Sequence, residues 1–574
     1  MLFKDLSIQT REFSRTSEKD NKIVIFLAKK IITMADDITE AEAVAVQNGS
    51  ILAVGSLSQI TSVLDAKGIA YEINDSYKEN VILPGFIEAH MHCQYTGANF
   101  NHIYAGYFDR HSPEGEIIKG CTNVDQIITR LKETLEANKD KYNDNVWLCA
   151  YGVDTLVLGD VVIDRNILDT ISKDIPIAVG HQSGHVMSIN SRAIELSGSE
   201  ERRNSHIGRY EDGTCNGVIA ELPNLGPVLA AGALKATGDP LDIAYRAGVD
   251  AGKVAKVNGC TTITDKGFGI PLVKNPIEGY KKMIETNEMP CRLVVEPIVE
   301  IVDTFFGGWD GLENLCQEME NDKFIFGNGK IVPDGSIQQY TAHLLNDKYY
   351  DGTPNSEMVM SKEEIKHAIK VAEDHGYACS VHANGNGATE LIIQAIEELH
   401  SEKPNTLFRH SLEHNQLVTE NQLYRMKQQG ISCNFFSNHM FYYGDVHAKF
   451  TVGPHEVKRM NPFRSAKNHG IRFTFHSDSP ITEVAPLFSA WCACNRKSMT
   501  GVVNGEDQCL TVAEALRCIT VEAAWLLGME DKIGSIEAGK WADFVVLEEE
   551  PTEDKKETLK DIKVITTVLG GKVI

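Results

Sequence analysis

Two histidines separated by a single residue, His90 and His92, follow the apolar run VILPGFIEA. Side chains two residues apart on a strand point to the same face, so both imidazoles would leave the end of this run together. Imidazole nitrogen is a common ligand of zinc and related divalent ions. The pair alone is weak evidence for a metal site, because nineteen histidines in 574 residues form such pairs by chance.

Three further residues share this placement. His382, His414 and Asp478 each stand at the C-terminal tip of a short apolar or β-branched run. A hydrogen-bonded core histidine would explain any one of them, but five such placements favour one shared metal site of imidazole and carboxylate ligands. The sequence therefore predicts one or two divalent metal ions per chain, with Zn2+ as the expected ion.

The runs that would carry these ligands alternate with amphipathic helical stretches, which predicts βα units and a parallel sheet. Candidate strands lie at 85–92, 261–265, 292–298, 329–335, 378–383, 409–414, 431–436 and 472–478. Eight strands are the number that closes a (β/α)8 TIM barrel, whose active sites lie at the C-terminal ends of its strands. The predicted fold class is therefore α/β, with the ligands at the mouth of a barrel.

Helix boundaries between the later strands carry clear signals. Ser361 and Glu364 form a capping box, and the helix that they open is expected to stop at Gly376. Thr419 and Gln422 open the next helix in the same way.

The two ends of the chain resemble each other more than they resemble the middle. Short strands with a hairpin signal at Gly49 fill the first 80 residues, and similar strands with a turn at Gly570 close the chain. We expect one β-sandwich domain from 1–83 and 529–574, flanking a barrel domain at 84–528. The stretch 93–250 is too long for a βα loop and predicts an inserted lobe after the first barrel strand.

The amino-acid composition disfavours some classes of binding partner. Fifty-six Lys and Arg against 80 Asp and Glu give a net charge of −24, which disfavours nucleic acid and anionic membrane surfaces. No run reaches the roughly 20 apolar residues of a membrane helix, and the start of the chain lacks a signal-peptide pattern. The thirteen cysteines are scattered without a CxxC pair, as expected for reduced thiols in a cytoplasmic protein. A small-molecule substrate is the expected partner, and self-association into a homo-oligomer stays open.

Several strings together resemble a known family. VILPGFIEAHMH, SVHANGNGA, RHSLEH, HSDSP and IGSIEAGKWADFVVL are similar to motifs of the amidohydrolase superfamily. GHQSGHVMSINSRAIELSG and DGTCNGVIAE are similar to its YtcJ-like, amidohydrolase 3 type group, which includes N-substituted formamide deformylase. The resemblance covers nearly the whole chain, but it does not identify a substrate.

The resemblance implies a barrel flanked by a small β-sandwich. It also implies that His90, His92 and Asp478 bind the more buried metal ion. A second ion would be bound by His382 and His414.

Many members of the family bridge two metals with a carboxylated lysine on the fourth strand, and Lys330 stands at that place. A free lysine would repel a dication, whereas carbamylation turns it into an anion. An ion-paired or solvent-facing lysine, and a site with a single metal, remain alternatives.

Other candidate positions are less specific. The resemblance makes His185 in the inserted lobe a candidate for orienting the substrate carbonyl, although a turn histidine would also fit; Glu221 is given no role. Asp334 would either line the substrate pocket or bond backbone in its own turn. Strand alternation predicts that His410, but not Glu413, shares the ligand face of its strand.

Two positions depart from the family pattern. Asn386 stands where an acidic residue is usual, and the segment 337–340 reads IQQY in place of L-G-S-R. The missing arginine would alter which substrates are held.

The residues thus predict a metal-dependent hydrolase of a C–N bond in a small amide or formamide-like molecule. Metal-activated water would be the nucleophile, and Asp478 would accept its proton and pass it to the leaving nitrogen, unless it serves only as a ligand. A deaminase of cyclic amidines with one metal is the alternative within enzymes. A barrel that serves as a non-catalytic scaffold is disfavoured, because every candidate ligand is present.

Overall fold

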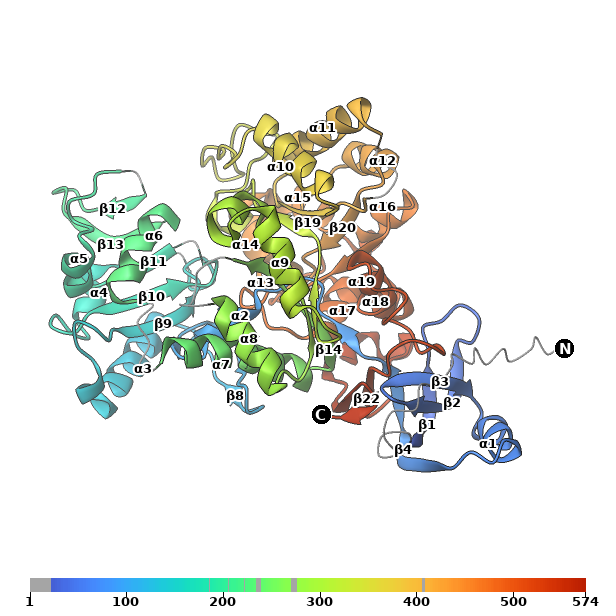
Figure 1. Cartoon of the computed structure of the whole chain (residues 1–574). Coiled ribbons are helices and arrows are strands. Elements are labelled where there is room, and N and C mark those ends of the chain that lie inside the picture. The colour runs from blue at the N-terminus through green and yellow to red at the C-terminus, as the bar shows by residue number, and fades with distance from the viewer. Residues whose placement is uncertain are drawn as a thin grey trace.

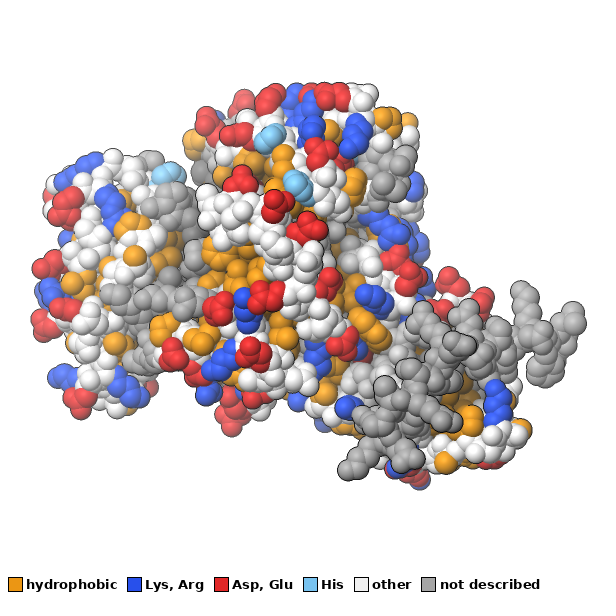
Figure 2. Space-filling model, viewed as in Figure 1, with side chains coloured by type: hydrophobic (Ala, Val, Ile, Leu, Met, Phe, Trp, Pro, Cys, Tyr) orange, Lys and Arg blue, Asp and Glu red, His pale blue; other side chains and the backbone are white. Residues whose placement is uncertain are grey.

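The computed structural model describes residues 22–159, 161–184, 186–204, 206–220, 222–233, 239–269, 276–404 and 408–574. Figure 1 shows three bodies side by side: a lobe of strands and helices, a helix-rich middle, and a sheet beside the C-terminus. The mixed α/β class expected from the alternating pattern is confirmed. Figure 2 shows acidic and basic side chains intermixed over the visible surface, with hydrophobic side chains gathered towards its centre.

One seven-stranded sheet combines both ends of the chain. Its order is β24 (Lys572–Val573), β23 (Val564–Leu569), β22 (Phe544–Leu547), β4 (Tyr71–Pro84), β1 (Ile23–Ile32), β2 (Glu40–Gln47) and β3 (Ser50–Gly55). The hairpins expected at Gly49 and Gly570 are confirmed as the β2–β3 and β23–β24 turns. Both glycines have positive φ, 79° and 56°, a conformation that costs glycine least.

The middle of the molecule holds two parallel sheets. The first has the order β16 (Phe324–Phe326), β15 (Arg292–Pro297), β14 (Cys260–Phe268) and β5 (Phe86–Ile87). The second has the order β17 (Gly329–Ile331), β18 (Cys379–Ala383), β19 (Ser411–His414), β20 (Ser432–Phe435) and β21 (Phe473–Phe475). A parallel bridge between Ile298 and Lys330 joins the two sheets at one side. Strands form at all eight predicted places, although the fourth is divided between β16 and β17.

The strands of these sheets are buried on both faces, as parallel strands are when helices cover them. The covering helices are α7 (Pro240–Val257), α8 (Pro276–Thr286), α9 (Trp309–Met319), α10 (Lys362–Asp374), α11 (Asn386–Glu402) and α12 (Glu420–Gln429). The capping boxes predicted at Ser361 and Thr419 are confirmed at the starts of α10 and α12. The helices therefore begin where the sequence places them.

The terminal sheet is joined to the parallel sheets by a buried ion pair. Nε of Arg292 in β15 lies 2.6 Å from Oδ2 of Asp543, and both side chains are 3% exposed. The guanidinium also stacks on the ring of Trp541 at 3.9 Å.

The inserted lobe, which lies between β5 and β14 in the sequence, is built on a separate six-stranded sheet. Its strand order is β12 (Ile207–Arg209), β13 (Cys215–Ala220), β11 (Val186–Ile189), β10 (Ile177–His181), β9 (Leu148–Val153) and β6 (Ile103–Tyr104). Arg110 of the lobe donates hydrogen bonds to the carbonyls of Pro480 and Ile481, at 2.6 and 3.0 Å. The lobe therefore holds the loop that follows Asp478.

Two sequence-based expectations concern cysteine and membranes. All thirteen cysteines lie in the described part of the chain and none forms a disulfide, in agreement with the expected reduced thiols. Among the described helices, none combines the length and apolar character needed to cross a membrane.

Candidate metal centre and cavity

His90 is fully buried where the segment after β5 enters the centre of the parallel sheets. Its Nδ1 lies 2.5 Å from Oε2 of Glu413. An ionised carboxylate only accepts hydrogen bonds, so Nδ1 carries the proton and Nε2 keeps its lone pair. Within the described part of the chain Nε2 has no hydrogen-bond partner, and it lies 3.4 Å from Oδ1 of Asp478. Burial, and secondly the charge of Lys330, hold the pKa of His90 well below its ordinary value, so the ring is neutral.

His92 reaches the same carboxylate oxygen. Its Nε2 lies 3.3 Å from Oδ1 of Asp478, an oxygen for which the described residues provide no hydrogen-bond partner. The backbone N–H of Asp478 donates to the carbonyl of His90 at 3.0 Å, and that of His92 donates to the carbonyl of Ser479 at 2.8 Å. These two hydrogen bonds fix the segments after β5 and β21 side by side. His90, His92 and Asp478 thus converge on one point and could hold a divalent ion.

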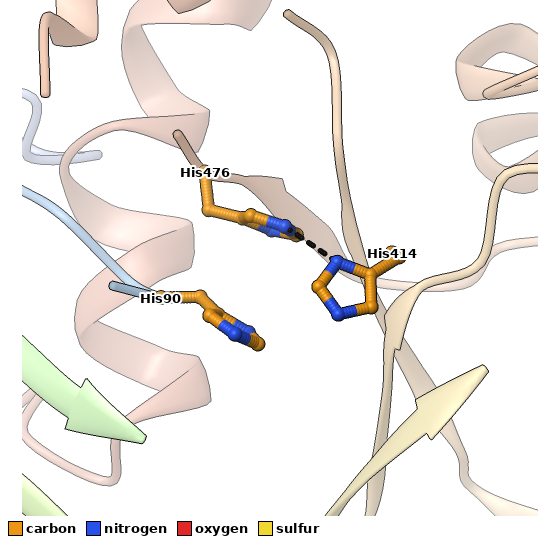
Figure 3. Close-up of side chains that lie close together, drawn as sticks. All are labelled: His90, His414 and His476. Atoms are coloured by element: carbon orange, nitrogen blue, oxygen red, sulfur yellow. Dashed lines mark hydrogen bonds between the residues drawn. The ribbon is translucent and has the colours of Figure 1, made fainter. Parts of the chain in front are cut away.

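The protonation of His414 follows from its neighbours (Figure 3). The Asn434 amide nitrogen donates to Oε2 of Glu413 at 2.7 Å, so its Oδ1, 2.9 Å from Nδ1 of His476, accepts from that ring. His476 therefore keeps the lone pair on Nε2, which lies 3.0 Å from Nδ1 of His414. It follows that Nδ1 of His414 is the protonated nitrogen and that Nε2 of His414 carries a lone pair.

His382 brings a second ring nitrogen to the same place. Its Nε2 lies 2.9 Å from the carbonyl oxygen of Gly335, which can only accept, and 3.0 Å from the amide nitrogen of Asn384, which can only donate, so either tautomer of His382 finds a partner. Its Nδ1 lies 3.0 Å from Nε2 of His414. Burial lowers the pKa of His414 far below its ordinary value, which favours the neutral ring. Two ring nitrogens 3.0 Å apart either share a proton in a hydrogen bond or bind one cation together.

Two buried lysines lie beside this cluster and differ in their partners. Lys330 in β17 is 1% exposed, and its Nζ has no hydrogen-bond partner among the described residues. Burial lowers the pKa of Lys330 to about 8, against the opposing charge of Glu413. Lys266 in β14 has Nζ 3.0 Å from Glu296 and 3.3 Å from Glu413. Burial favours the neutral form of Lys266, but these two carboxylates outweigh it and raise its pKa.

The expected facing of His410 and Glu413 is wrong. Ser411 and Glu413 point inward and share a hydrogen bond of 2.8 Å, while His410 points outward to Glu373 of α10 at 2.9 Å. His414 nevertheless reaches the cavity, because its φ of 68° places it in the left-handed region and breaks the alternation at the strand end.

Sequence reasoning missed three buried groups. His476 stands two residues before Asp478, the spacing that had singled out His90 and His92, and could have been found by the same rule. Oε1 of Glu88 accepts the backbone N–H groups of His90 and Ser477, at 3.2 and 3.1 Å, and burial raises its pKa to about 7. Lys266 carries no spacing signal, because its partners Glu296 and Glu413 lie on other strands.

Asp334 is held by backbone. One oxygen accepts the N–H of His343 at 2.8 Å, and the other accepts those of Asn384 and Gly385 at 2.8 and 2.9 Å. Asp334 is not among the described residues that line the cavity. Burial raises its pKa to about 6, and the structure places it as a tie between loops rather than as a substrate contact.

The two departures from the family pattern also have a structural place. Oδ1 of Asn386, where an acidic residue is usual, accepts the backbone N–H of Leu345 at 2.8 Å. Gln338, in the IQQY segment, is buried in the cavity wall.

A cavity of about 250 Å3 lies between the parallel sheets and the lobe. On the sheet side its wall includes His92, Lys330, His382, His414 and Asp478. The lobe side contributes uncharged side chains, of which some, such as His102, Tyr151 and His181, are polar and the others are small or apolar. The small or apolar ones include Ala178, Val186, Met187, Leu225, Leu229 and Ala233.

His185, a candidate for orienting the substrate carbonyl, and Glu221, which was given no role, both lie outside the described residues. His181 is described: it is buried, lines the cavity, and its Nε2 lies 3.1 Å from Oγ of Ser188.

A second group of histidines and a carboxylate lies on the outer face of the second parallel sheet. It comprises Glu373, His400 and His410. Nδ1 of His410 accepts the backbone N–H of Cys379 at 3.1 Å, so its Nε2 is protonated and donates to Glu373. The proton occupies the position that a metal ion would need.

Comparison with solved structures shows the same fold in metal-dependent hydrolases. An uncharacterised metal-dependent hydrolase from Pyrococcus horikoshii OT3 aligns with a TM-score of 0.71 at 18% identity, over 93% of this chain and 99% of that one. A second, from Pyrococcus furiosus, aligns with a TM-score of 0.68 at 20% identity, over 92% and 99%.

Sequence comparison finds distant relatives along the full length. The chain is 26% identical to putative amidohydrolase YtcJ of Bacillus subtilis, over 95% of this chain and 98% of the relative. It is 25% identical to N-substituted formamide deformylase of Arthrobacter pascens, over 92% and 94%. It is 23% identical to the protein LONG AFTER FAR-RED 3 of Arabidopsis thaliana, over 94% and 90%. The profile of the amidohydrolase family matches residues 78–574, and the chain belongs to that family.

Proposed function

We propose that this chain is a metal-dependent hydrolase that cleaves the C–N bond of a small amide, such as an N-substituted formamide. The observation that carries the proposal is the convergence of possible ligand atoms described above: Nε2 of His90 beside Oδ1 of Asp478, and Nε2 of His414 beside Nδ1 of His382. The relative named N-substituted formamide deformylase supports the choice of bond.

The residues present fit a divalent metal. His90, His92 and Asp478 would hold one ion, and His382 and His414 a second; neutral imidazole and carboxylate suit Zn2+. A bound ion would lower the pKa of its water towards about 7 and polarise the scissile carbonyl. Glu413 orients His90, and Asn434 through His476 orients His414, so both rings present lone pairs without rearrangement.

Asp478 would move the protons. Its Oδ1 has no hydrogen-bond partner among the described residues, and the residue lines the cavity, so this oxygen would accept a proton from water and return it to the leaving nitrogen. Proton transfer of this kind contributes about 10²–10⁴-fold to a rate.

Lys330 would bridge the two ions after carboxylation. Its neutral amine adds to CO2, a C–N bond forms, one proton leaves, and the product is an anionic carbamate. The support is its position: a buried Nζ without a hydrogen-bond partner is costly as a cation, and the carbamate would replace it with a metal ligand.

The finer architecture belongs to the same proposal. The two parallel sheets would together form a (β/α)8 barrel, bridged at Ile298 and Lys330 on one side and by the backbone bonds between His90 and Asp478 on the other. The sheet from both chain ends would belong to a flanking domain, 1–83 plus 529–574, around a barrel domain of 84–528.

The test is a metal analysis joined to a hydrolysis screen over formamides, other amides and cyclic amidines. Two ions per chain with amide turnover would support the proposal, whereas one ion with amidine deamination would support a deaminase instead. Asp478→Asn should lower kcat/KM by at least about 10³-fold while the melting temperature stays close to that of the wild type. Full activity in that variant, or a purified protein without metal, would refute the mechanism.

A further inference from the structure

The two walls of the cavity differ in charge, and this difference bears on which substrate can bind. The charged side chains among its described lining residues are Lys266, Lys330 and Asp478, all on the parallel-sheet side. The described lobe side carries no Asp, Glu, Lys or Arg. Its apolar residues come from β10, β11 and the helical segment 222–233.

Three buried polar atoms elsewhere in the cavity wall have no hydrogen-bond partner among the described residues. They are Oγ of Ser336, Oε1 of Gln338 and Nε2 of His439. Their residues are 7%, 5% and 1% exposed, and all three line the cavity. A buried polar group without a partner costs about 1–3 kcal/mol, so these atoms are expected to bind something polar in the cavity.

The partners of His439 leave it able to donate or accept. Its Nδ1 lies 3.3 Å from Nε2 of His447, and Nδ1 of His447 lies 2.7 Å from the hydroxyl of Thr451. A hydroxyl can donate or accept, so the hydrogen bonds that link His439, His447 and Thr451 can be oriented in either direction. Burial and the neighbouring His447 hold the pKa of His439 well below its ordinary value, so the ring is a neutral hydrogen-bonding group.

We propose that the cavity selects an uncharged amide whose substituent is apolar, with Gln338 and His439 contacting the polar amide group and the lobe wall covering the substituent. This inference rests on the proposed function and names its substrate class. The small cavity, about 250 Å3, limits the substituent to a short chain or a single ring.

A carboxylate on the substituent would be rejected by this geometry. Its charge would lie against Met187 and Leu229 with no cation on the described lobe wall to compensate it. Burying an unpaired charge costs far more than burying a methyl group gains. The segment 337–340, which reads IQQY, supplies an amide at Gln338 where the family pattern has an arginine nearby.

The test compares two substrates of equal length, N-pentylformamide and 5-formamidopentanoate. We expect kcat/KM for the carboxylate to be at least about 10²-fold lower. Met187→Lys should raise the ratio of carboxylate to pentyl turnover by at least about 10-fold, whereas Met187→Leu should leave it unchanged. Leu229→Lys serves as the second charge variant if Met187→Lys does not fold.

Gln338→Leu and His439→Phe test the polar contacts. Each should raise KM for N-pentylformamide by about 10-fold without loss of bound metal. Unchanged KM in both variants would overturn the assigned contacts.

A binding measurement separates this inference from the proposed function. Calorimetry with pentylurea and 5-ureidopentanoate reports the preference of the cavity without any hydrolysis. Binding of the uncharged urea alone would support the selectivity even if no amide were hydrolysed, an outcome that would refute the proposed function. Equal or tighter binding of the carboxylate, or its faster turnover, would overturn the inference and leave the amidase proposal standing.

Discussion

Two clusters of histidine and glutamate lie on opposite faces of the same strand, β19. The inner cluster joins His90 to Glu413, and the outer cluster joins His410 to Glu373. Both are buried, and both bring histidine nitrogens and a carboxylate together. Residue types alone do not distinguish them.

The two clusters differ in which ring nitrogen of the histidine faces the carboxylate. Glu413 accepts from Nδ1 of His90, so the lone pair on Nε2 faces the cavity and the free oxygen of Asp478. Nδ1 of His410 is occupied by a backbone N–H, so its proton lies on Nε2 and points at Glu373. The inner cluster therefore has nitrogen lone pairs directed at the cavity. In the outer cluster both ring nitrogens of His410 are hydrogen-bonded within the protein, and its bond to Glu373 links the start of β19 to α10.

The largest expected difference is in activity. His90→Asn removes a metal-facing lone pair and its tie to Glu413, and should lower kcat/KM by at least about 10³-fold together with the metal content. His410→Asn is the matched control, since its side-chain oxygen can still accept the N–H of Cys379. Comparable losses of activity in both variants would break the distinction between the clusters.

The two buried lysines beside the inner cluster are expected to differ in their contribution to stability. Lys266→Met leaves Glu296 and Glu413 without their cation and should lower the free energy of unfolding by about 3–5 kcal/mol. Lys330→Met removes a lysine without a hydrogen-bond partner and should leave the stability of the metal-free protein unchanged or higher. Urea unfolding in the presence of a chelator measures both. A larger loss at Lys330 would mean that its charge is paired.

The sequence predicts the fold better than it predicts the site. Eight strand positions and two helix caps follow from local signals, because hydrophobic period and capping act over a few residues. The strand end at His414 does not follow, because its left-handed φ is imposed by the surrounding structure and overrides the alternation that had turned Glu413 away from the cavity.

The candidate ligands were found because each stands at or just beyond the C-terminal end of a strand. Their orientation could not be predicted, since it depends on partners far away in the chain: Glu413 lies 323 residues from His90, and Asn434 lies 42 from His476. Such pairs leave no spacing pattern in a single sequence.

A smaller effect is expected when the outer carboxylate is changed. Glu373→Gln weakens the hydrogen bond from His410 and should cost about 1–3 kcal/mol of unfolding free energy. Activity and metal content should stay within about two-fold of the wild type, because neither Glu373 nor its partners His400 and His410 are among the described residues that line the cavity. A loss of bound metal in this variant would show that the outer cluster contributes a ligand.

The smallest effect concerns pH. Burial, partly offset by Glu373, lowers the pKa of His410 in the folded chain below its ordinary value near 6.5. Between these two pKa values the unfolded chain binds a proton that the folded chain does not, so stability is present above about pH 6.5 and is lost as the pH falls towards the folded pKa. One such group contributes at most about 1.4 kcal/mol per pH unit. Unfolding at pH 7.5 and 5.5 with chelator present should therefore show a smaller loss in His410→Asn than in the wild type. The comparison isolates the histidine, because the pKa of Glu373 is itself lowered and its contribution is lost only below about pH 4.5. An equal or larger loss in the variant would mean that His410 is charged in the folded protein.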